Sequence, residues 1–120
     1  MTPNEARVNA ALGKVVGIVD IQECTCRKFV TGRWPDGHCG HIDFLHHCNA
    51  SKMLLAKLAE KGFGWQLQRG LEEYEQGRHM FHIWKLWASH RETHRAYGAT
   101  EEEAVVKVAC AAFGIPWEES

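Results

Sequence analysis

The sequence lacks any long apolar run, and no stretch approaches the roughly 20 residues that a membrane-spanning helix needs. It also lacks the pattern of a signal peptide, since residues 1–5 are polar and no apolar core follows them. We therefore expect a cytoplasmic protein with no membrane partner. Cysteines are normally reduced in that compartment, so the five cysteines indicate thiol or metal chemistry in preference to a disulfide framework.

An excess of charge of one sign is also absent. The chain has 14 basic and 15 acidic residues, which gives a net charge of −1 with neutral histidines. This balance argues against a nucleic-acid binder that ignores sequence, because such proteins usually display a basic excess. It leaves room for a local basic patch. The eight histidines would turn the net charge positive between about pH 7 and pH 6.

Familiar catalytic motifs are missing as well. The chain contains no His-Glu-x-x-His sequence, no phosphate-binding loop and no dinucleotide-binding glycine pattern. The zinc-deaminase pattern consists of His-x-Glu followed by Pro-Cys-x-x-Cys. The chain has no Cys-x-x-Cys pair, and residues 41–43 read His-Ile-Asp, which matches the first part poorly. These absences favour a protein that is not an enzyme.

Metal-competent side chains are abundant between residues 24 and 48, where four cysteines and four histidines occur. Zinc prefers four thiolate or imidazole ligands, so one interpretation is a structural zinc site. Its ligands would be Cys24, Cys26 and Cys39, with His41 or Cys48 as the fourth. The close pairs are separated by one residue, which is tighter than the usual spacing of roughly two to four.

Two other interpretations of this cluster stay open. Free cysteines often pack as small hydrophobic residues, and histidines in a polar loop need no role. A reactive thiol is the third interpretation, in which Cys39 or Cys48 has a neighbouring histidine as its base.

Capping residues and apolar periods predict an α+β fold in one domain, residues 1–120. Helices are expected over residues 2–17, 49–62 and 100–114, each starting at a capping residue and ending near a glycine. The expected strands cover residues 18–21, 63–68, 79–88 and 92–97. The strand at 79–88 is apolar on both faces, which predicts cover on both sides. Residues 22–48 show no period and are expected to be irregular. The result would be a short antiparallel sheet of three to four strands packed between helices.

Two sets of residues are candidate partner-binding sites. Arg33 and Trp34 lie in a turn-rich loop, and this pair of residue types is frequent among interface anchors. The second set is a basic patch suited to an anion or a nucleic acid, with a solvated sheet face as the alternative. Its members are His82, Arg91, His94 and Arg95.

Three segments have distinctive helix ends and small apolar residues: VNAALGKVVG (8–17), ASKMLLAKL (50–58) and ATEEEAVVKVACAAFG (99–114). Together they resemble the phage ABA-sandwich family, which consists of small phage and prophage proteins with a short antiparallel sheet between layers of helix. The likeness extends over residues 5–17 and 49–114. The resemblance implies that the chain has this fold, originates from a phage and is located in the cytoplasm of an infected bacterium. It supplies no catalytic residues.

The leading hypothesis is a non-catalytic, phage-type binding protein that inhibits a bacterial defence system. It would act like an anti-CRISPR protein by occupying a host protein, or it would sequester a signalling nucleotide. The alternatives are a zinc-stabilised nucleic-acid-binding protein and a cysteine–histidine enzyme. A homodimer is a further expectation, because a short sheet has two edges and the chain is rich in tryptophan.

Overall fold

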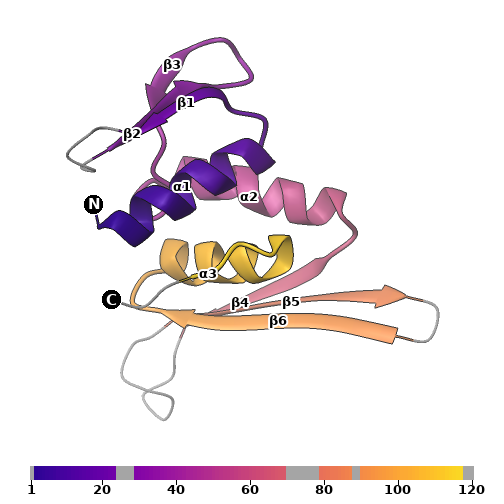
Figure 1. Cartoon of the computed structure of the whole chain (residues 1–120). Coiled ribbons are helices and arrows are strands. Elements are labelled where there is room, and N and C mark those ends of the chain that lie inside the picture. Colours follow the sequence, from indigo (N-terminus) through magenta and orange to yellow (C-terminus); the bar gives the residue numbers. More distant parts are fainter. Residues whose placement is uncertain (1, 24–28, 70–78, 88–89, 118–120) are drawn as a thin grey trace.

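The structure, a computed structural model, describes residues 2–23, 29–69, 79–87 and 90–117 (Figure 1). Along these residues the elements are α1 (Pro3–Val15), β1 (Val19–Glu23), β2 (Val30–Arg33), β3 (Cys39–His41), α2 (Cys48–Glu60), β4 (Gly64–Arg69), β5 (His79–Trp87), β6 (His90–Gly98) and α3 (Glu101–Phe113). The α+β class expected from the sequence is confirmed. No helix within these ranges is long and apolar enough to span a bilayer.

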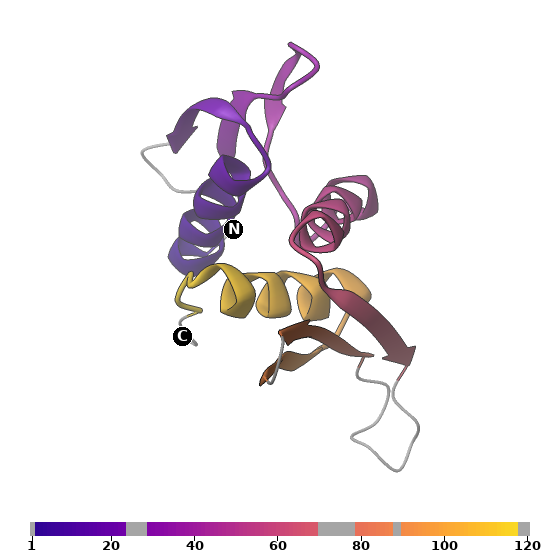
Figure 2. The ribbon, with the colours of Figure 1, turned by 90° about the vertical axis from the view of Figure 1, so that its right-hand side faces the viewer.

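The strands form two separate antiparallel sheets of three strands each, in the orders β1-β2-β3 and β4-β5-β6. Helix α1 packs against β1 and β2, whereas α3 packs against β5, β6 and α2. The helices therefore lie between the two sheets, as Figures 1 and 2 show. The sheet β4-β5-β6 is the short antiparallel sheet that the sequence predicts.

The first sheet corrects the expectation that residues 22–48 are irregular. Strands β2 and β3 form within this segment, where β2 pairs with both β1 and β3. Each of them contains a glycine, so their inner faces show no apolar alternation. At Gly32 the glycine is required, because a Cβ atom there would lie 2.5 Å from Cγ2 of Ile18. The strand approaches this neighbour too closely for a side chain.

The ends of α3 are set by residues within one turn of each terminus, as the sequence predicts. Thr100 Oγ1 accepts a hydrogen bond from the Glu103 N–H at 3.1 Å, and the Glu103 carboxylate accepts one from the Ala99 N–H at 3.0 Å. Gly114 ends the helix with φ of +71°, in the left-handed region that glycine adopts without steric cost. Thr2 caps α1 through its own hydroxyl group.

The two faces of β5 differ in exposure. Phe81 and Ile83 are fully buried on the face that meets α3. On the opposite face Trp84 is half-buried, and Leu86 exposes 76% of its surface. The prediction that both faces of this strand are covered is therefore wrong for the described residues. No described element packs on the outer side of the second sheet (Figure 1).

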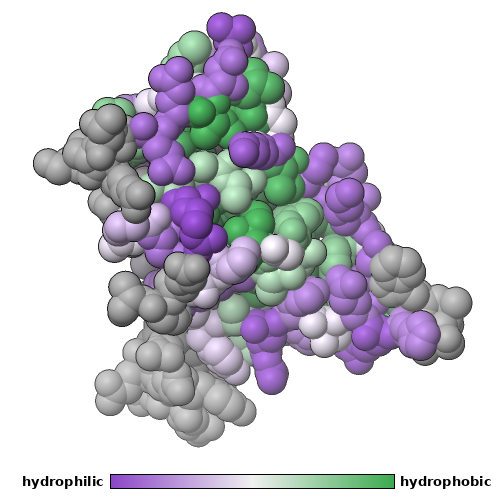
Figure 3. Space-filling model, in the orientation of Figure 1, coloured by the Kyte–Doolittle hydropathy of each residue, from purple (hydrophilic) through white to green (hydrophobic). Residues whose placement is uncertain are grey.

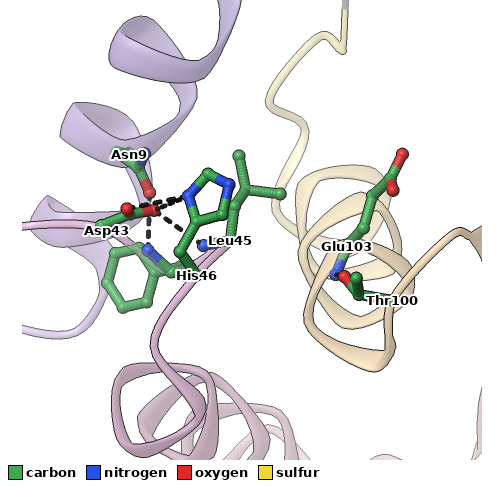
Figure 4. A network of polar contacts seen from close by, with 7 residues as sticks. Asn9, Asp43, Leu45, His46, Thr100 and Glu103 are labelled. Carbon is green, nitrogen blue, oxygen red and sulfur yellow. Dashed lines mark hydrogen bonds and ion pairs between the residues drawn. The ribbon is translucent and has the colours of Figure 1, made fainter. Parts of the chain in front are cut away.

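A buried amide links α1 to the segment between β3 and α2. Asn9 is fully buried within a cluster of apolar residues that draws on all three helices and both sheets. Its Oδ1 accepts a hydrogen bond from the Phe44 N–H at 2.9 Å (Figure 4). Phe44 is itself fully buried. The bond therefore holds the chain that precedes α2 against α1.

We predict that Asn9→Ala lowers the free energy of unfolding by about 1–3 kcal/mol, because it leaves the buried Phe44 N–H without its acceptor. The measurement is chemical denaturation followed by circular dichroism. Asn49→Ala is the matched control, since Asn49 is exposed and surface substitutions usually change stability by less than about 0.5 kcal/mol. Equal stability of the two variants would contradict the role given to Asn9.

Candidate functional site

A hollow of about 580 Å³ lies between the turn that follows β2 and the first turns of α2. We call it the Trp34 hollow. In Figure 2 the β2–β3 hairpin and α2 stand on the same side of α3. Hydrophobic residues show at the surface between the first sheet and the helices (Figure 3). The volume falls in the range of about 300–1,000 Å³ that is typical of small-molecule sites.

One wall of the hollow is the indole of Trp34. This half-buried ring stacks on the His38 imidazole with 5.8 Å between ring centroids and 3° between ring planes. It also meets the buried Phe44 ring at 6.3 Å. The backbone N–H of Trp34 donates to the His38 carbonyl oxygen at 2.9 Å, and the backbone N–H of Gly37 donates to the Trp34 carbonyl oxygen at 2.9 Å. The turn therefore holds the indole as a fixed aromatic surface.

Two carboxylates at the hollow have imidazole partners. Asp36 accepts hydrogen bonds from the His38 backbone N–H and from its ring, and these bonds hold the pKa of the Asp36 carboxyl below its usual value of 3.8. Asp43 accepts from the Leu45 N–H at 3.2 Å and pairs with His46 Nδ1 at 2.9 Å (Figure 4). When these imidazoles are protonated, they offset the negative charge of both carboxylates.

The opposite wall is the start of α2. The extended backbone continues to His47 (φ −121°, ψ 110°), so the helix begins at Cys48 and the expectation that Asn49 caps it is wrong. His47 makes no side-chain capping hydrogen bond, and the first turn carries no acidic residue. The first N–H groups of a helix have no partner within it and carry partial positive charge. In this turn the Ala50 and Ser51 N–H groups already donate to the His47 carbonyl oxygen, both at 3.1 Å. His47, Asn49 and Ala50 line the hollow, so this helix end forms part of its wall.

The proposed zinc ligands are only partly described. Cys24 and Cys26 lie outside the described residues, as does the side chain of Cys48. Cys39 is exposed, and His41 stacks on Phe29 with ring centroids 5.1 Å apart. Among the described side chains, no group of three or more histidines, cysteines or carboxylates could hold a metal ion. The structural zinc site stays a prediction.

Arg33 and Trp34 face different hollows, although they are adjacent in sequence. Arg33 lines a smaller hollow of about 220 Å³ with Cys39 and Thr31, and its guanidinium lies 3.8 Å from the Asp20 carboxylate. Trp34 lines the larger one. Neighbouring residues of an extended chain point to opposite sides. The two residues therefore do not form one joint anchor.

The second predicted patch divides between the two faces of the second sheet. Arg95 pairs with His82 across the β5–β6 ladder. Arg91 lies on the same outward face, because it is separated from Arg95 by an even number of residue positions along β6. His94 points to the opposite face, where its Nε2 lies 3.2 Å from a Glu92 oxygen and its ring lies 6.2 Å from the Phe63 ring. The structure brings three of the four residues to one face and separates His94 from them.

Sequence reasoning missed the residues that α2 contributes to the Trp34 hollow, namely His47, Asn49, Ala50 and Met53. The sequence carried no signal for this, because Asn49 is a good capping residue and predicts a capped helix start. It also missed that Trp84 shares the outward face with Arg95, which the alternation along β5 and β6 implies.

Comparison with protein-family models found no match, and comparison with curated proteins found none. The resemblance to the phage ABA-sandwich family is therefore still an expectation. It depends on the quoted helix ends and small apolar residues in segments 5–17 and 49–114.

We predict that the two described free cysteines differ in reactivity. Cys110 is 1% exposed, and burial raises the pKa of its thiol to about 12, so it stays protonated and poorly nucleophilic. Cys39 is exposed. Iodoacetamide at pH 8 should modify Cys39 in the native protein and Cys110 only after denaturation, as measured by peptide mass spectrometry. Equal labelling of both cysteines under native conditions would show that Cys110 is not buried as described.

Proposed function

We propose that this chain is a non-catalytic, phage-type binding protein that inhibits a bacterial defence system by sequestering a signalling nucleotide in the Trp34 hollow. The observation that carries the proposal is a fixed indole surface opposite a helix start that has no side-chain cap. A nucleotide has a flat aromatic base and an anionic phosphate, so it matches both walls. The phage setting is the one implied by the family resemblance.

The base has a suitable surface in the exposed part of the Trp34 ring. Aromatic side chains bind bases by stacking, and each such contact contributes about 1–3 kcal/mol. The stack of Trp34 on His38 fixes the orientation of the indole before a ligand arrives. A ring that is already ordered loses little side-chain entropy on binding, which favours affinity.

The phosphate has a suitable partner in the N-terminus of α2. Helix N-termini bind phosphate through backbone N–H groups and the positive end of the helix dipole. The imidazoles of His41 and His47 also line the hollow. The carboxylates of Asp36 and Asp43 oppose an anion unless their partners His38 and His46 are protonated. The side of the hollow formed by α2 carries no carboxylate among its described lining residues, so an anionic group is best accommodated there.

The composition of the lining favours binding over catalysis by a hydroxyl, thiol or amine nucleophile. The described residues that line the hollow include no cysteine, serine, threonine or lysine, so a hydroxyl, thiol or amine nucleophile is absent from them, and only carboxylates and imidazoles could take that role. The carboxylate–imidazole pairs are engaged at the rim, and both His38 and His46 are exposed. The two carboxylates of the described lining, Asp36 and Asp43, each have an imidazole partner, so neither is left unpaired to attack a ligand.

We predict that Trp34→Ala weakens nucleotide binding about five- to a hundredfold, because it removes the stacking surface. The probes are AMP, GMP, their 3′,5′-cyclic forms and cyclic dinucleotides, measured by isothermal titration calorimetry on the full chain. Trp34→Phe keeps an aromatic face and should retain most of the affinity. Lys61→Gln is the remote control, since Lys61 is exposed at the far end of α2.

Two outcomes would contradict this function. One is that no nucleotide of the panel binds. The other is that Trp34→Ala and the wild-type chain bind with the same affinity. If a purified host protein binds instead and Trp34→Ala releases it, the chain occupies that protein and the nucleotide proposal is wrong.

A further inference from the structure

The strand register assigns every residue of the second sheet to an inner or an outer face. Phe81 and Ile83 are buried on the inner face, so the outward residues have even numbers in β4 and β5 and odd numbers in β6. No described element covers this outer face (Figure 1). We infer that it binds single-stranded nucleic acid, a second activity that goes beyond the nucleotide hollow.

The charged side chains at the described outward positions of this face are all basic. None of the described outward positions in β4, β5 or β6 holds Asp or Glu, whereas Arg91 and Arg95 are both exposed there. Neither guanidinium takes part in an ion pair within the described part of the chain. Glu92 points inward, where it pairs with His94. In a chain with a net charge of −1, this separation makes the face complementary to an anion.

The same face carries aromatic surface. The Trp84 indole lies across β4 at Gly64, where a Cβ atom would come within 3.0–3.1 Å of three indole atoms. A side chain at position 64 would therefore press against the indole, and glycine lets the ring pack closely on this strand. The His82 ring lies 5.4 Å from the Trp84 ring, and Tyr97 is 38% exposed. Flat aromatic rings beside arginines are the features with which proteins bind unpaired bases and their phosphates.

These features favour a single strand over other occupants. A sheet face offers stacking surfaces for splayed bases, whereas base edges in a duplex are reached by elements that enter a groove. Successive outward residues on one strand lie about 6.6–6.8 Å apart, which leaves room for a base on each of His82 and Trp84. A second copy of this chain would add two more arginines to an interface whose described outward positions hold no carboxylate. The exposed Leu86 adds apolar surface that a base can cover.

The test is fluorescence anisotropy of the full chain with a labelled 15-nucleotide single strand, as DNA and as RNA, and with the matching duplex. We expect the single strands to bind more tightly than the duplex. Trp84→Ala should weaken this binding about five- to a hundredfold, whereas Trp84→Phe should retain most of it. The double variant Arg91→Gln/Arg95→Gln should reduce the slope of log K against log salt by about 1.4, since each phosphate contact contributes about 0.7.

Lys14→Gln is the control for charge, because Lys14 is exposed on α1 and distant in the fold from the second sheet. It should leave affinity and salt slope unchanged. The inference is overturned if no oligonucleotide binds at 50 mM salt, if the duplex binds at least as tightly, or if Lys14→Gln weakens binding as much as the arginine variants. It is also overturned if Trp34→Ala, and not Trp84→Ala, abolishes oligonucleotide binding, because the ligand then occupies the hollow.

Self-association is tested with the same variants. Sedimentation equilibrium shows whether the wild-type chain is a dimer and whether Trp84→Ala separates it. A dimer that depends on Trp84 and does not bind oligonucleotides would overturn the inference, since the outer face would then be covered by a second copy. Thermal unfolding of Trp84→Phe provides the check that the sheet is intact in the binding assay.

Discussion

The hydrogen bond from the Phe44 N–H to the buried Asn9 amide is the constraint on which the arrangement of this molecule depends. Buried polar groups in folded proteins are nearly always paired, so this contact permits few alternative positions of the segment that carries Phe44. That segment leads from β3 into α2 and contains Asp43 and His46. The bond from α1 therefore positions the first sheet relative to α2, and with it both walls of the Trp34 hollow.

Helix ends were predictable because their determinants are local. Thr100, Glu103 and Gly114 form the caps of α3 through contacts within a few residues, which a sequence pattern records. Strands β2 and β3 were not predictable in this way. They are held by pairing across the sheet, and Gly32 is needed for its approach to Ile18, which lies 14 positions earlier in the chain. Such a tertiary contact leaves no periodic signal in the sequence.

The candidate sites show the same difference between features set by local sequence and features set by tertiary contacts. Alternation along strands was enough to bring His82 to one face with Arg95, and it also separates His94 from them. Arg33 and Trp34 were expected to act together because they are adjacent, yet an extended backbone turns them toward different hollows. The contribution of α2 to the Trp34 hollow required the tertiary structure, since Asn9 and Phe44 set the place of this helix.

The central position of the helices has a consequence for the second sheet. Because α3 covers the inner face, Trp84 and Leu86 lie on the side that no described element buries, and Leu86 remains 76% exposed. Exposed apolar surface is unfavourable in water by about 25 cal/mol per Å², and clustered apolar residues on a surface usually mark an interaction site. Apolar contact alone would suit many partners. The arginines beside these residues, without a carboxylate among the described outward positions, favour a partner with negative charge.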